Sequence, residues 1–197
     1  MRLSVPVDRK VTMGLRCGQT VSLDGTVHTG RDEMHLRALE YHRGGREIPV
    51  DLEGGAVFHC GPIMVEDQGK WRLVAAGPTT SARMNSLEPD FILAFRPAAI
   101  IGKGGMSTPT VEAMKEVGCV YLALTGGAAV LAARGISEVK GVEWLDLGMP
   151  EALWILEAME LGPLIVAIDA HGNSLYDQVS DDVKRNLPSI REHLGLE

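Results

Sequence analysis

The chain contains 197 residues, of which 45% are hydrophobic and 23% charged, and it carries a formal net charge of −7. This length predicts one domain over residues 1–197, and this composition predicts a globular protein. The negative charge argues against nucleic-acid binding, because that needs clustered Lys and Arg side chains that the sequence lacks. No segment is apolar over the length of a signal-peptide core or a membrane span, so we expect a cytoplasmic protein without membrane contact.

The first half of the sequence predicts short strands joined by turns, with turn signals at Asp24-Gly25 and Gly44-Gly45. One helix interrupts the strands. The segment Thr29–Asp32 fits a capping box, and apolar residues recur at helical spacing from Met34 toward Gly44. The expected strands cover residues 3–7, 13–15, 56–58 and 72–76, the last of them a short buried strand.

The second half alternates strands and helices, which is typical of parallel strands joined by crossover helices and predicts an α/β protein. Residues 151–161 are ambiguous: their Ala, Leu and Glu favour a helix, whereas the hairpin expected after them favours a strand, and we favour the strand. An apolar segment at 91–95 precedes strands over 99–101, 120–124, 142–147 and 164–168, and helices are expected over 108–117, 128–134 and, started by Ser180, 181–194.

One junction between a strand and a helix has the features of an anion site. Gly77-Pro78 ends the strand over 72–76, and Thr79 or Thr80 can cap a helix from about Ser81. Such a turn aims unpaired N–H groups outward, and Arg83 adds a positive charge beside them. A carboxylate or a phosphate is therefore the first ligand to consider.

Two further helix starts share this arrangement, with Arg31 after Thr29-Gly30 and Lys103 before Gly104–Pro109. For any one junction, a solvated cap is the simpler interpretation. A cation is unfavourable at a helix N-terminus, however, so three of them predict an anion supplied from outside. A small polycarboxylate fits best, because Arg binds carboxylates with two parallel hydrogen bonds. His35, one turn after Arg31, is placed to reach the same site.

Other chemistries have weaker support in the sequence. The loop Gly102–Gly105 matches neither the Gly-Lys-Ser/Thr phosphate motif nor the dinucleotide glycine pattern, and no Ser or Cys has the local signature of a nucleophile. Cys17, Cys60 and Cys119 are too widely spaced for zinc pairs or a disulfide framework. Without a Cys-x-x-Cys spacing, they also argue against an iron–sulfur cluster held by this chain alone.

Taken together, the motifs resemble those of the class I fumarate hydratase and L(+)-tartrate dehydratase β subunit. The resemblance spans nearly the whole chain, and several ordered motifs at compatible spacings make it specific. It is carried by Thr29–Asp32 with His35, Gly61-Pro62, Ala76–Thr80 with Arg83-Met84, Ile101–Gly105, Leu147–Ala152 and Asp169–Asn173.

The resemblance implies a fold, a partner and a cofactor. The fold is a three-layer swivelling β/β/α domain with mixed sheets and helices on one side, equivalent to the C-terminal domain of single-chain enzymes. The partner is an α subunit that holds a four-iron, four-sulfur cluster, and the active site forms between the two subunits. This would account for the absence of cluster spacing among the cysteines of this chain. We expect a heterodimer or an α2β2 assembly.

The resemblance also assigns roles to single residues in the reversible hydration of fumarate to malate. Thr79 corresponds to the residue that removes a proton, and Arg31, Arg83 and Lys103 correspond to carboxylate binders, with Thr80 beside them in the substrate site. The proton leaves a carbon next to a carboxylate, so fixed cations must stabilise the resulting dianion. Thr is a weak base, and we expect a neighbouring positive charge, that of Lys103, to lower its pKa.

Two alternatives remain open at this point. The chain can be the β subunit of an L(+)-tartrate dehydratase, because tartrate differs from malate by one hydroxyl group. It can also be a stand-alone carboxylate-binding module that has kept the pocket without a catalytic partner.

Overall fold

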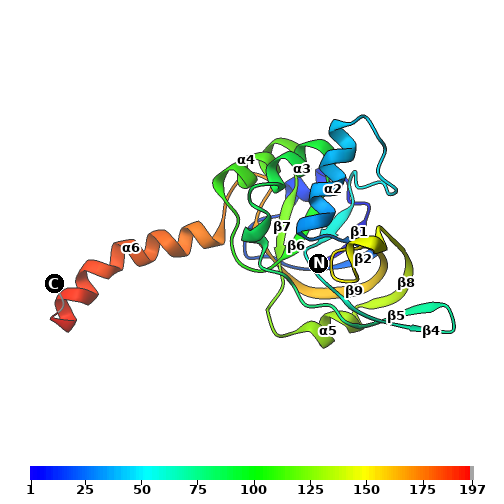
Figure 1. Ribbon diagram of the computed structural model, residues 1–197. Helices are drawn as coiled ribbons and strands as arrows, with labels where there is room; N and C mark the ends of the chain where they lie inside the picture. The colour runs from blue at the N-terminus through cyan, green and yellow to red at the C-terminus, as the bar shows by residue number, and fades with distance from the viewer. Residues whose placement is uncertain (196–197) are drawn as a thin grey trace.

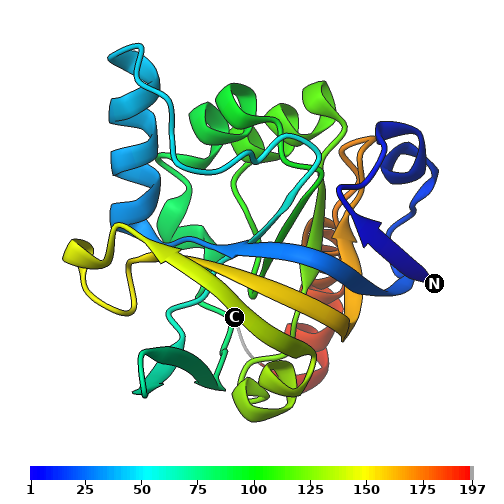
Figure 2. The same ribbon diagram turned by 90° about the vertical axis from the view of Figure 1, so that its right-hand side faces the viewer.

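The computed structural model describes residues 1–195 and contains a closed, barrel-like sheet. β2, β3, β6 and β7 are neighbours in parallel order, and β9 closes the ring because it pairs antiparallel with both β7 and β2. Figure 2 shows the two long strands, β2 and β9, curving across the molecule. The barrel strands are β2 (Thr20–Thr29), β3 (Ala56–Phe58), β6 (Ala99–Gly102), β7 (Val120–Ala123) and β9 (Leu153–Ile168).

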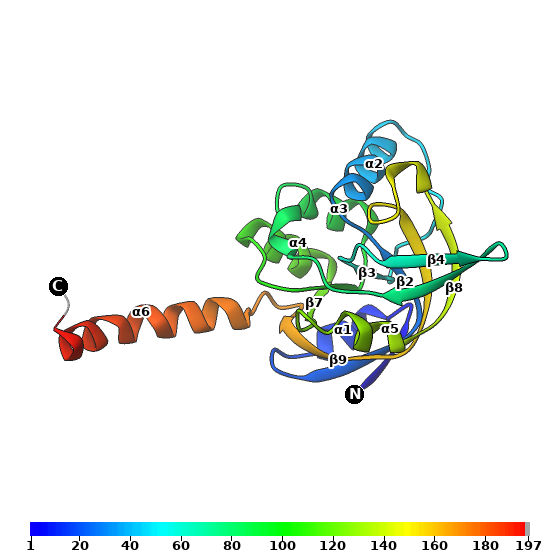
Figure 3. The same ribbon diagram turned by 60° about the horizontal axis from the view of Figure 1, so that its bottom comes forward.

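Two further strands extend this sheet along its long members. β1 (Arg2–Val5) runs parallel to the first half of β2, and β8 (Ile136–Glu143) runs antiparallel to the first half of β9. The sheet is therefore mixed, as expected. A β-hairpin of β4 (Ile63–Asp67) and β5 (Lys70–Ala75) forms a separate two-stranded sheet beside β8 (Figure 3).

Alternation along the short strands divides the core in two. Phe58 and Ile101 belong to the cluster inside the barrel, whereas their neighbours Val57 and Ile100 belong to the cluster under the helices. Successive side chains of a strand point to opposite faces, so a strand with both faces buried reads as a continuous apolar run. This is why residues 56–58 and 99–101 could be predicted as strands.

Three helices cover one side of the barrel and supply the second core cluster (Figures 1 and 2). They are α2 (Asp32–Arg43), α3 (Glu88–Phe95) and α4 (Thr108–Val117). The apolar segment at 91–95 thus belongs to a helix. The α/β class is confirmed, whereas the three-layer swivelling type stays a prediction.

Several predicted elements differ in the structure. Residues 13–15 do not form a strand but end the short helix α1 (Arg9–Gly14), because the Asp8 carboxylate caps that helix by accepting from the backbone N–H of Lys10 at 2.7 Å. The strand at 72–76 exists as β5, yet it lies at an edge with alternate residues exposed. Of residues 151–161, the strand that we favoured covers 153–161, and it continues through residues 164–168 as the single strand β9, whereas 151 and 152 belong to the preceding turn.

The later helices and strands also shift. The strand expected at 142–147 lies earlier, as β8, and Leu145–Leu147 form a turn of 3-10 helix, η2. The small-residue helix is α5 (Ala129–Arg134). The C-terminal helix, α6 (Leu175–Leu194), starts before Ser180, because the hydroxyl of Ser174 accepts from the N–H of Asp177 at 3.2 Å and caps it.

Asp24-Gly25 lies inside β2 instead of forming a turn. Gly25 has a φ of +99°, and a Cβ atom there would lie 2.6 Å from the carbonyl oxygen of Val5 on β1. We therefore expect Gly25→Ala to lower the free energy of unfolding by about 1–3 kcal/mol, as measured by urea denaturation. Gly14→Ala is the control, since a Cβ atom there meets nothing within 4 Å. Equal stability of the two variants would contradict this explanation.

α6 projects away from the body of the protein (Figure 1). None of its residues is buried, and its large apolar side chains recur three or four positions apart on one face. This stripe consists of Tyr176, Val179, Val183, Leu187, Ile190 and Leu194. No helix within residues 1–195 is both long and apolar enough to cross a bilayer.

Candidate active site

The three predicted helix starts lie close together in the structure. Arg31 is the residue immediately before α2, and the side chain of the next residue, Asp32, pairs with Arg83 at 3.1 Å. Arg83 belongs to η1 (Ser81–Met84), a single turn of 3-10 helix. The residue after η1, Asn85, accepts a hydrogen bond from the backbone N–H of Ser107, which precedes α4, at 2.9 Å.

Backbone hydrogen bonds fix Thr79 beside Lys103. The N–H of Thr79 donates to the carbonyl of His59 at 2.6 Å, and the carbonyl of Thr79 accepts from the N–H of Lys103 at 3.3 Å. The N–H of Ser81 then donates to the carbonyl of Lys103 at 2.9 Å, and Thr80 forms a bridge with Lys103. These segments follow β3, β5 and β6, and the carboxyl ends of the parallel strands β3 and β6 meet at one edge of the sheet.

Three cations and two carboxylates lie at this edge, and they are partly accessible. Arg31 is 20% exposed and pairs with Glu151 at 3.1 Å, whereas Arg83 is 53% exposed. Lys103 is half-buried and has no carboxylate within ion-pair distance among residues 1–195. Thr79 is half-buried and Thr80 exposed, so the cluster is open to solvent on one side.

Glycines allow the close approaches on which the cluster depends. A Cβ atom on Gly61 would lie 2.6 Å from Nη1 of Arg31, and one on Gly126 would lie 3.4 Å from Cδ of Lys103. A Cβ atom on Gly102 would lie 1.9 Å from the hydroxyl oxygen of Ser81. Glycine at position 61 therefore leaves room for the Arg31 side chain, and glycine at position 102 leaves room for the Ser81 hydroxyl.

The predicted caps are wrong. The hydroxyl of Thr29 does not cap α2; it donates to the carbonyl of Ala152 at 3.2 Å and accepts from the N–H of Trp154 at 3.1 Å. Neither Arg31 nor Thr80, the residues that stand at the two N-cap positions, makes a side-chain capping bond. Because η1 has only one turn, it has little helix dipole with which to attract an anion beside Arg83.

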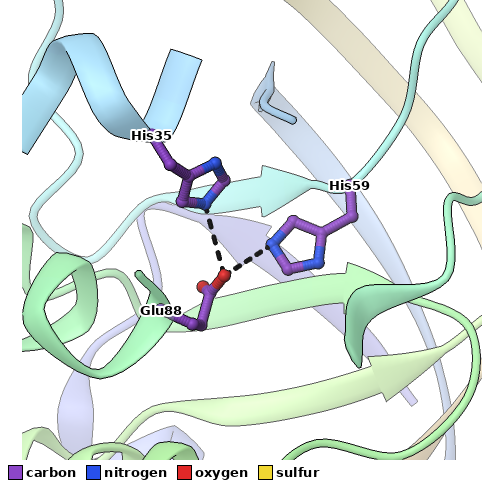
Figure 4. Close-up of side chains that lie close together, drawn as sticks. All are labelled: His35, His59 and Glu88. Atoms are coloured by element: carbon purple, nitrogen blue, oxygen red, sulfur yellow. Dashed lines mark ion pairs between the residues drawn. The ribbon is translucent and has the colours of Figure 1, made fainter. Parts of the chain in front are cut away.

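His35 lies inside the protein with no exposed surface, instead of at the mouth of the site. Its Nε2 is 3.3 Å from a carboxylate oxygen of Glu88, and Nε2 of His59 is 3.1 Å from the same oxygen (Figure 4). Burial lowers the pKa of His35, but the Glu88 carboxylate, the backbone carbonyl of Arg31 and Asp32 together outweigh burial and raise this pKa above its usual value. Burial alone would raise the pKa of Glu88, but the two imidazoles hold it well below its usual range.

This buried cluster was not predicted as a unit. Its members come from α2, the segment after β3 and the start of α3, so no local spacing links them. The Ser81 hydroxyl extends the cluster, because it lies 2.9 Å from Nδ1 of His59 and accepts a hydrogen bond from the Tyr121 hydroxyl at 2.9 Å.

The cysteines of this chain do not fit an iron–sulfur cluster. Cys60 and Cys119 are buried, and burial raises the pKa of Cys60 to about 12, so its thiolate is disfavoured. Cys17 is half-buried, and its thiol donates to the backbone carbonyl of Asn173 at 3.1 Å. Within residues 1–195, the side chains that converge closely enough to hold an ion are those of His35, His59 and Glu88, without a cysteine.

The chain matches known proteins over most of its length. The family model described as "Fumarase C-terminus" matches residues 2–179. A Methanocaldococcus jannaschii protein provisionally named L(+)-tartrate dehydratase subunit beta is 44% identical over 189 residues, 95% of each chain. The L(+)-tartrate dehydratase subunit beta of Escherichia coli K12 is 43% identical over 173 residues, 88% of this chain and 85% of that protein. A Geobacillus stearothermophilus protein provisionally named class I fumarate hydratase is 38% identical over 191 residues, 96% of this chain and 36% of that protein.

Proposed function

The chain belongs to the fumarase C-terminus family, and on that premise we propose that it is the β subunit of a two-subunit hydro-lyase acting on a small hydroxy diacid. The observation that supports this best is that backbone bonds join Thr79 to Lys103 at one edge of the barrel, and that an Asp32–Arg83 ion pair links the segments that carry Arg31 and Arg83. Even with Glu151 and Asp32 paired to Arg31 and Arg83, these groups carry a net positive charge, which favours a dicarboxylate and the more strongly charged state formed when it loses a proton.

The proposed roles follow from the placement of the side chains. Arg31 and Arg83 are oriented by Glu151 and Asp32, and each guanidinium has further N–H groups with which to bind a carboxylate. Thr79 removes or returns the proton on the carbon next to a carboxylate, with Thr80 contacting the substrate beside it. Lys103 lowers the pKa of the Thr79 hydroxyl and binds the developing negative charge.

The cofactor and the partner form a second part of the proposal. Because the residues of this chain do not fit an iron–sulfur cluster, we assign the four-iron, four-sulfur cluster to an α subunit. The name "subunit beta" of the relatives supports such a partner. A swivelling β/β/α domain and a cytoplasmic location complete the proposal.

The substrate is proposed only as a class. Fumarate hydratase was the first expectation, but the relatives named as tartrate dehydratase subunits are 43–44% identical and the one named as a fumarate hydratase 38%. The higher identity supports L(+)-tartrate as a second candidate substrate beside fumarate and malate. The carboxylate binders suit both substrates, so the groups that recognise the extra hydroxyl of tartrate need not lie in this chain.

The test is anaerobic reconstitution of the chain with its α subunit, followed by a panel of fumarate, malate, L(+)-tartrate and methylated analogues. We expect no activity of this chain alone and hydration or dehydration of one diacid by the complex. Activity of this chain alone without iron would refute the two-subunit proposal. Tight malate binding by calorimetry, without turnover in the complex, would favour the carboxylate-binding module.

A partner chain should cover the apolar stripe of α6. Replacing Val183 and Leu187 by Asp should therefore reduce the mass of the co-expressed assembly, as measured by light scattering after gel filtration, because two charges would enter a buried apolar contact. Ser189→Asp, an exposed position off the stripe, is the control and should assemble normally. An unchanged mass for the double variant would show that the stripe is not an assembly contact.

A further inference from the structure

The buried side chains around Glu88 connect two parts of the candidate site. His35 and His59 contact one carboxylate oxygen of Glu88 from two different elements, and all three side chains are 0% exposed (Figure 4). Glu88 is the first residue of α3, the helix that follows η1 along the chain, and Arg83 belongs to η1. Glu88 therefore links the segment that carries Arg31 to the segment after β3, beneath the candidate site.

One arm of the cluster reaches Arg31. Nδ1 of His35 lies 2.7 Å from the backbone carbonyl oxygen of Arg31. A carbonyl can only accept, so Nδ1 carries a hydrogen. Nε2 faces a carboxylate oxygen, where a lone pair would be repelled, so it carries a hydrogen as well. His35 is then an imidazolium, and its positive charge balances the buried carboxylate.

The other arm reaches Thr79 and Lys103. Nε2 of His59 also faces Glu88, at 3.1 Å, and Nδ1 of His59 lies 2.9 Å from the Ser81 hydroxyl, which can donate its hydrogen to that nitrogen. That leaves the Ser81 oxygen free to accept from Tyr121. His59 and Ser81 are also the residues whose backbones bond to Thr79 and Lys103. The hydrogens of Tyr121 and Ser81 then point along one series of contacts toward His59.

A metal ion fits the same residues less well. Structural zinc sites almost always have four protein ligands, and catalytic sites complete three protein ligands with a water or a substrate. This cluster offers three side chains without exposed surface, and the Ser81 hydroxyl is engaged by His59 and Tyr121. The N–O contacts to Glu88 lie at angles outside those of a hydrogen bond, so they act mainly through charge. A carboxylate with one imidazolium is neutral as a whole without an added cation.

We propose that Glu88 is a positioning residue of the hydro-lyase site, which through His35 and His59 fixes Arg31 relative to Thr79 and Lys103. This rests on the proposed function. The carboxylate itself touches no substrate, because it has no exposed surface. Its role is to hold the segment that carries Arg31 at a fixed distance from the segments that carry Thr79 and Lys103. A misplacement of about 1 Å in such a site costs roughly 100-fold in rate.

The test uses the reconstituted complex with Glu88→Gln, which keeps the size of the side chain and removes its charge. We expect kcat to fall about 100-fold, with a smaller change in KM because the carboxylate binders themselves remain. Glu112→Gln, an exposed glutamate on α4, is the control and should leave kcat unchanged. Wild-type kcat in a folded Glu88→Gln complex would overturn the proposal.

A second measurement keeps the proposal testable on the chain itself. Nitrogen-15 spectra of the histidines should show both ring nitrogens of His35 protonated at pH 8, and the Glu88→Gln variant should lose this signature. A neutral His35, or a stoichiometric metal by elemental analysis, would overturn the proposal.

The Ser81→Ala variant serves if Glu88→Gln does not fold, because it removes only the hydroxyl that contacts His59. It should lower kcat about 10-fold, a smaller loss than full misplacement. Wild-type kcat in Ser81→Ala would count against the proposed role of His59 and Ser81. An inactive wild-type complex would instead refute the proposed function while leaving the His35 spectrum informative.

Discussion

Replacing Arg83 by alanine should lower kcat/KM of the reconstituted enzyme by on the order of 10²–10³. Arg83 lies in η1, two residues after Ser81, whose N–H bonds to the carbonyl of Lys103, and its ion pair with Asp32 holds the guanidinium in place. Its positive charge would stabilise the negative charge that develops when a proton leaves the carbon next to a carboxylate. Steady-state kinetics across substrate concentrations would measure the loss.

The chain contains a matched control for this variant. Arg43 also forms a partly exposed ion pair with an aspartate, Asp90, at 2.8 Å, but it lies at the far end of α2. Such exposed pairs contribute little to stability, so Arg43→Ala and Arg83→Ala should unfold at similar temperatures. Only the second should lose activity. Equal activity of the two variants would remove Arg83 from the site.

The sequence was sufficient to predict the cationic edge, because each part of it is local. Gly77-Pro78 and Gly102–Gly105 are breaks after apolar strands, and the cations stand at fixed distances from them. Parallel strand order explains why the break after β6 lies at the same edge as the end of β3, whereas Gly77-Pro78 follows the separate hairpin strand β5. The length of the helix after Thr80 could not be predicted, since one 3-10 turn and a longer helix begin with the same residues.

The parts that the sequence could not predict depend on distant partners. Asp24-Gly25 has the composition of a turn, and only pairing with β1 and β9 makes it part of a strand. The sequence suggests that the hydroxyl of Thr29 caps a helix, but this hydroxyl donates to the carbonyl of Ala152 and accepts from the N–H of Trp154, at the start of β9. Glu88 reads as an ordinary acidic residue in a first helical turn, because both histidines that surround it come from earlier elements.

Thr79→Val should lower kcat by about 10²–10⁴ and change KM much less. Valine keeps the shape of the side chain and removes the hydroxyl that we propose as the proton-transferring group. The backbone bonds of residue 79 to His59 and Lys103 do not involve the side chain, so the loop should keep its geometry. Single-turnover kinetics would show whether the chemical step has slowed.

Two further variants separate chemistry from packing. Thr79→Ser retains a hydroxyl and should recover most of the lost rate, since β-branching is not needed for proton transfer. Thr80→Val removes the neighbouring exposed hydroxyl and should act mainly on KM, because that residue contacts the substrate without moving a proton in the proposal. If Thr80→Val lowered kcat more than Thr79→Val, the two threonines would exchange roles. The cationic edge would stand, because the positions of Arg31, Arg83 and Lys103 do not depend on which hydroxyl reacts.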